Sequence, residues 1–164
     1  PEEHSQTSLL LQDKGIEVIK DLVFEFRASA ILSTLKMTCR LIKLSVGSEK
    51  FNAMLRYYCS VNPSELFIFA NAERFAEYIS TLDLQIPHLE TLLEFELASS
   101  YTRMDGQMRT VHFYCDPFIL IESLVNYKKP ELPEAQAVYA VDIQPDEVYQ
   151  SGKSFMQYNS VFHN

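Results

Sequence analysis

The sequence has few glycines, few cysteines and no long apolar run, and each shortage excludes a class of protein. Its 4 glycines are dispersed, so no glycine-rich loop is present to hold the phosphates of a nucleotide. The 3 cysteines show no paired spacing, which argues against a disulfide framework and predicts free thiols in a reducing, cytoplasmic setting. No apolar run approaches the ~20 residues of a membrane-spanning helix. No signal peptide is visible, and because the sequence opens with Pro-Glu-Glu-His we expect its natural start to lie upstream.

Basic residues are also scarce. The chain has 14 Lys and Arg against 22 Asp and Glu, a formal net charge of -8. Nucleic-acid-binding proteins usually carry a basic face that replaces the counterions of the phosphate backbone. The basic residues here are scattered, and we interpret the small group around Arg40 and Lys43 as a solvated helix face. The charge therefore predicts no nucleic-acid partner.

Catalytic and metal-binding patterns are missing as well. No G-x-S-x-G elbow is present for a nucleophilic serine. His112 and Cys115 are the close pair of soft ligands, but their spacing places them on opposite faces of a strand. Glu90 and Glu94 share a helix face, which we interpret as a charged flank, and Glu96 is expected to make a helix-packing hydrogen bond to a neighbouring loop. We predict no catalytic residue, no metal ligand and no cofactor in this chain.

The residues that are plentiful predict a folded, mainly helical first part. Hydrophobic residues make up 47% of the chain, with 9 Tyr and 11 Phe, which is enough to bury a core. From residue 8 to 36 apolar side chains recur every three to five positions, with Gly15 as a break. The members of this first stripe are Leu11, Ile16, Ile19, Val23, Phe26, Ala30 and Leu35.

Three further helices are expected before residue 106. Helical periodicity continues over 37–46, where Gly47 is a stop and Ser48 the N-cap of the next helix. A turn at 62–64 precedes another helix. The last of the series is expected to carry Pro87 at its first position and to end at 105–106.

After Gly106 the pattern changes. Residues 109–114 alternate as in a strand, Asp116-Pro117 predicts a helix start, and 135–143 is the clearest strand. The predicted inner face of that helix consists of Phe118, Ile121, Leu124 and Val125. We predict an α+β fold with a helical bundle domain over 1–106 and a small strand–helix–strand module over 107–164. Its tail, 151–164, is a third strand or an arm that orders on a partner.

The predicted two-stranded sheet offers a binding edge, to which an extended peptide can add as a further strand. The predicted peptide-binding residues are Phe113, Phe118, Tyr139, Val141 and Ile143. An ordinary stabilising appendage remains the alternative.

Six positions in the helical part carry a family resemblance. They are Gly47, Phe51, Pro63, Phe75, Pro87 and Glu96. At these intervals the chain resembles the helical domain, catalogued as DNA-binding, of small partner proteins of multinuclear non-heme iron oxidative enzymes. The resemblance runs from about Phe26 to Ile143, and the strand–helix–strand region resembles leader-peptide recognition modules in its order of elements.

The resemblance implies a function without catalysis. Such a chain would bind the leader of a ribosomally made precursor peptide and form a heterodimer with the iron enzyme, which would supply all iron ligands. The 3-thiaglutamate pathway is the subtype most resembled. The alternative is a DNA-binding or regulatory helical domain, and a stand-alone enzyme is the third reading.

Overall fold

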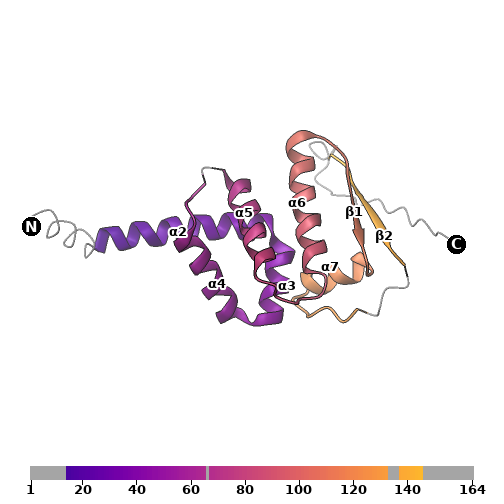
Figure 1. The fold of residues 1–164 in the computed structure, drawn as a ribbon, viewed down its shortest axis with the longest axis horizontal. Coiled ribbons are helices and arrows are strands. Elements are labelled where there is room, and N and C mark those ends of the chain that lie inside the picture. Colours follow the sequence, from indigo (N-terminus) through magenta and orange to yellow (C-terminus); the bar gives the residue numbers. More distant parts are fainter. Residues whose placement is uncertain (1–13, 66, 133–136, 146–164) are drawn as a thin grey trace, which may run out of the picture.

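The computed structural model describes residues 14–65, 67–132 and 137–145, and it has an α+β fold in which the helices come first (Figure 1). Leu11, the start of the predicted strand at 135–136 and the tail 151–164 lie outside the described residues. In chain order the elements are α2 (Lys14–Thr34), α3 (Lys36–Val46), α4 (Ser48–Val61), α5 (Ile68–Thr81), α6 (Leu89–Asp105), β1 (Arg109–Phe113), α7 (Pro117–Val125) and β2 (Tyr139–Ile143). The predicted fold class is confirmed.

The junction between α3 and α4 is a single glycine. Gly47 has φ 90 and ψ 154, a conformation that side chains disfavour, and it ends α3 as predicted. The same residue is the N-cap of α4, so the prediction of Ser48 as N-cap was wrong and Ser48 is the first helical residue. One residue therefore ends one helix and begins the next.

The starts of α6 and α7 differ in how well the sequence predicted them. α6 begins at Leu89 with His88 as its N-cap at φ 64, so Pro87 precedes the helix instead of occupying its first position. For α7 the predicted signal is confirmed: the Asp116 carboxylate accepts from the backbone N–H groups of Phe118 (2.8 Å) and Ile119 (3.3 Å). A proline alone marks a helix start less securely than a proline preceded by an Asp cap.

The two described strands pair antiparallel, with Val111 opposite Val141 and Phe113 opposite Tyr139. Because side chains alternate along a strand, Val111, Phe113 and Val141 share one face, and all three are buried. The Phe113 ring meets the Phe95 ring of α6 edge-on, with 5.6 Å between centroids. The sheet thus rests its apolar face on α6, as its place beside that helix in Figure 1 shows.

The core runs without interruption from the helices into the strand–helix–strand part. One cluster of buried apolar side chains includes Ile31, Phe75 and Leu92 from the helices together with Leu120 and Leu124 from α7. The predicted inner face of α7 was partly wrong. Phe118 and Val125 are 56% and 49% exposed, while Pro117, Leu120 and Leu124 are the buried residues.

Candidate functional site

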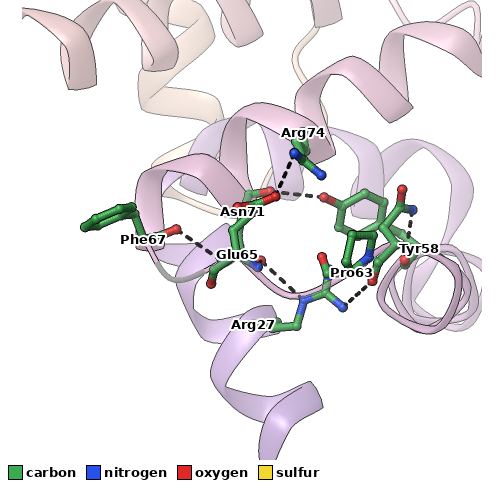
Figure 2. Close-up of polar contacts among 8 residues, drawn as sticks. Arg27, Tyr58, Pro63, Glu65, Phe67, Asn71 and Arg74 are labelled. Carbon is green, nitrogen blue, oxygen red and sulfur yellow. Dashed lines mark hydrogen bonds and ion pairs between the residues drawn. The ribbon is translucent and has the colours of Figure 1, made fainter.

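Arg27 is a buried charge that holds the end of α4 (Figure 2). Its guanidinium donates to the backbone oxygens of Cys59 (2.6 Å), Asn62 (2.9 Å) and Pro63 (3.1 Å), and to the side-chain oxygen of Asn71 (3.3 Å). Carbonyl groups at a helix C-terminus have no partner within the helix and carry partial negative charge. Arg27 therefore joins α2 to the ends of α4 and α5 as a structural residue.

Glu96 caps α3 from a distance in sequence. Its carboxylate oxygens accept from the backbone N–H groups of Met37 (2.7 Å) and Thr38 (2.9 Å), in the first turn of that helix. Burial raises the pKa of Glu96, while the two backbone hydrogen bonds act in the opposite direction. The expected packing hydrogen bond is thus present, directed to a helix N-terminus just after the bend at Leu35.

Arg40 is occupied by α7. Its guanidinium donates to the backbone oxygens of Leu124 (3.1 Å) and Val125 (3.3 Å) and lies over the Tyr127 ring, 4.1 Å from the centroid. These contacts join α3 to the C-terminus of α7 in the same manner as Arg27 joins α2 to α4. The Arg40 guanidinium is therefore engaged in contacts within the fold.

The thiols and histidines do not form a reactive group in the described part of the chain. Burial raises the pKa of the thiols of Cys39 and Cys59, and raises that of Cys115 to about 11, so all three are protonated near neutral pH. Burial lowers the pKa of His88. No three His, Cys, Asp or Glu side chains of the described residues are placed to hold a metal ion, and no described helix is long and apolar enough to cross a bilayer.

A groove of about 390 Å³ lies beside β2. Residues Val141 to Gln144 form one wall, and Phe95 to Arg103 of α6 form another. The remaining lining comes from the α2–α3 junction and α7: Ser33, Thr34, Lys36, Met37 and Ile121. The edge of β2 that faces away from β1 pairs with no other described strand, so every second residue there has free backbone groups.

The structure separates the five predicted peptide-binding residues. Phe113 and Val141 are 0% and 2% exposed and belong to the core, so their side chains are not exposed contacts, although Val141 borders the groove. Tyr139 and Ile143 are half-buried on the same face, and Phe118 is exposed on α7. The correction follows from the pleat, because odd-numbered residues of both strands face α6. The accessible features of β2 are its backbone edge and the adjoining groove.

A second hollow of about 450 Å³ lies at the loop between α5 and α6. Its lining comes from residues between Ile79 and Leu93 and from Tyr114. Three non-glycine residues of this loop, Asp83, Gln85 and His88, have positive φ. The wall of this hollow includes Tyr114, which directly follows β1, and among the described residues it holds no three His, Cys, Asp or Glu side chains placed to bind a metal ion.

Comparison with family models, curated proteins and solved structures returned no match.

Proposed function

We propose that this chain is a non-catalytic, cytoplasmic partner subunit that binds the leader of a ribosomally made precursor peptide along the outer edge of β2. It would present that peptide to a multinuclear iron-dependent oxidative enzyme, with all iron held by the enzyme. The observation that carries the proposal is the unpaired β2 edge next to a groove of about 390 Å³.

The energetics of strand addition set the expected affinity. Each added backbone hydrogen bond contributes about 0.5–1.5 kcal/mol net, and ordering the peptide removes part of that gain. Micromolar binding is the natural scale for a five-residue edge. Side chains of the peptide that point inward would enter the groove, where Phe95 and Ile121 provide apolar surface.

The direct test is backbone hydrogen exchange of the full chain, with and without the leader of the precursor peptide encoded beside its gene. A scrambled leader of the same composition is the control. We expect alternate β2 amides to exchange quickly in the free chain and to become protected when the leader is added. Leader binding that leaves β2 exchange unchanged would place the peptide elsewhere.

Filling the groove tests the same proposal with a matched pair of variants. Ser99 lines the groove and its hydroxyl donates to its own helix at Phe95 O, 2.7 Å away. Ser60 donates in the same way to Tyr57 O at 2.7 Å on the exposed side of α4. We expect Ser99→Phe to weaken leader binding at least about tenfold and Ser60→Phe to leave it unchanged. Equal effects of the two variants would contradict the groove assignment.

A further inference from the structure

The first half of α2 carries an apolar surface that the described fold does not cover. Val18, Ile19, Leu22, Val23 and Phe26 are each 46–64% exposed. In Figure 1 this half of the helix projects beyond the other helices. Contiguous exposed apolar side chains of this kind mark interaction sites in soluble proteins.

The second half of α2 packs against the core, whereas the first half is largely exposed. In the second half Arg27, Ala28 and Ile31 are buried, and they follow a different face from the exposed residues. The predicted stripe of the sequence included Ile19, Val23 and Phe26, so its helical period was correct although these side chains do not reach the core.

The exposed residues have the spacing of a docking helix. Ile19, Leu22, Val23 and Phe26 stand at positions i, i+3, i+4 and i+7, the arrangement by which a helix anchors in an apolar groove. We propose that this surface, which we call the α2 stripe (Val18, Ile19, Leu22, Val23 and Phe26), inserts into an apolar groove of a different protein whose rim is basic. This inference is independent of whether a peptide binds β2.

The charged residues of α2 favour a different protein over a membrane or a second copy of this chain as the binding partner of the α2 stripe. Glu17, Asp21 and Glu25 follow one another at intervals of four along one flank of the α2 stripe, where Glu25 is seven residues from Val18, and the lysines of the same half are Lys14 and Lys20. Helices that lie on membranes carry lysine and arginine on the polar face, which disfavours a lipid surface here. Two copies of this chain repel each other with a net charge of -8 apiece, whereas a basic groove rim gains from the same acids.

The test places a photo-crosslinking benzoylphenylalanine at Leu22 of the full chain, expressed in its native host, and maps the products by mass spectrometry. The matched control carries the same group at Phe67, which is 75% exposed. We expect the Leu22 probe, and not the Phe67 probe, to mark one different protein at apolar groove residues flanked by lysine or arginine. A product with a second copy, with residues 1–13 or 146–164 of the same chain, with lipid, or no product would each overturn the proposal.

A binding measurement with the identified protein completes the test. Leu22→Glu and Phe26→Glu should each weaken the complex at least about 30-fold, as expected for central anchors of an interface. Phe67→Glu, the same kind of change at a more exposed site, should alter the affinity less than about twofold. Because all three side chains are exposed, circular dichroism should report unchanged helicity. Equal affinity of the Leu22 and Phe26 variants and the parent would reject the α2 stripe as the docking surface.

Discussion

At the scale of single residues, three charged side chains bind the ends of helices. Arg27 and Arg40 donate to C-terminal carbonyl groups, and Glu96 accepts from N-terminal N–H groups. Each contact joins helices that are far apart in sequence and satisfies backbone groups that a helix leaves unpaired. Charge in the interior therefore serves connection between elements.

Replacing Arg27 should destabilise the fold strongly. Arg27→Ala leaves carbonyl groups of Cys59, Asn62 and Pro63 without their donor, and we expect a loss of about 3–5 kcal/mol in the free energy of unfolding. Urea denaturation followed by circular dichroism measures it. Arg56→Ala is the control, because Arg56 is exposed and lies over the Phe24 ring, and it should cost less than about 1 kcal/mol. Equal losses would remove the special role of Arg27.

Glu96 should make stability fall as pH rises. Burial raises its folded-state pKa above the ordinary value of 4.5, so in the window above 4.5 the folded state binds more protons than the unfolded state. The stability that this shift contributes is fully present below the pKa of Glu96 in the unfolded state. It is lost as pH rises through the pKa of Glu96 in the folded state. Relative to Glu96→Gln, the parent should gain stability as pH falls from neutral towards 4.5, with a slope of at most about 1.4 kcal/mol per pH unit for one proton. Parallel unfolding curves for the two proteins over that range would contradict the assignment.

These residue contacts were only partly readable in the sequence. Glu96 was expected to make a packing hydrogen bond, and it does. Arg27 gave a usable signal, an arginine between Phe26 and Ala28 in the second half of α2, but its partners lie 32 to 44 residues away. Spacing along one helix cannot reveal which distant carbonyl groups a side chain will reach.

At the scale of elements, the sequence predicted which helices and strands are present better than it predicted where each one begins and ends. The helices and both strands are present, because apolar periodicity of 3.6 or 2 residues reflects which faces meet the core. The prediction of which face of α7 is buried was partly wrong, because a short helix with apolar residues on all sides does not reveal that face. The bend at Leu35 was not expected either, because the cap that begins α3 comes from α6.

The two described positive-φ glycines should respond differently to substitution. Neither would bring a new Cβ within 4 Å of another group, so backbone conformation alone decides the cost. Gly106 has φ 69 and ψ 15, a left-handed region that asparagine tolerates, whereas Gly47 has φ 90 and ψ 154, which suits glycine alone. We expect Gly106→Asn to cost less than about 1 kcal/mol and Gly47→Asn about 1–3 kcal/mol in thermal or urea unfolding. A reversed order would show that the local conformations differ from those described.

At the scale of the whole molecule, the boundary near residue 106 is a change of secondary structure inside one continuous core. The sequence suggested a bundle over 1–106 and a separate module over 107–164, since the residue pattern changes at Gly106. Packing between distant segments is invisible to such a pattern. The structure places Val111 and Phe113 in the same apolar cluster as the helices, and Arg40 at the end of α7.

The fragment 1–106 should therefore not fold stably by itself. Without β1, α7 and β2, Phe95 and the surface that Leu120 covers would be exposed to solvent. The buried side chains that the fragment lacks contribute on the order of 10 kcal/mol to the free energy of unfolding, comparable with the total stability of a small domain. Circular dichroism should show reduced helicity and a broad thermal transition for the fragment. In the full chain, Phe113→Ala should cost about 3–5 kcal/mol while helix signal and tyrosine fluorescence still change in one shared transition. A fragment with full helicity and a sharp transition would instead establish an independent bundle, with the strand–helix–strand part as an attachment to it.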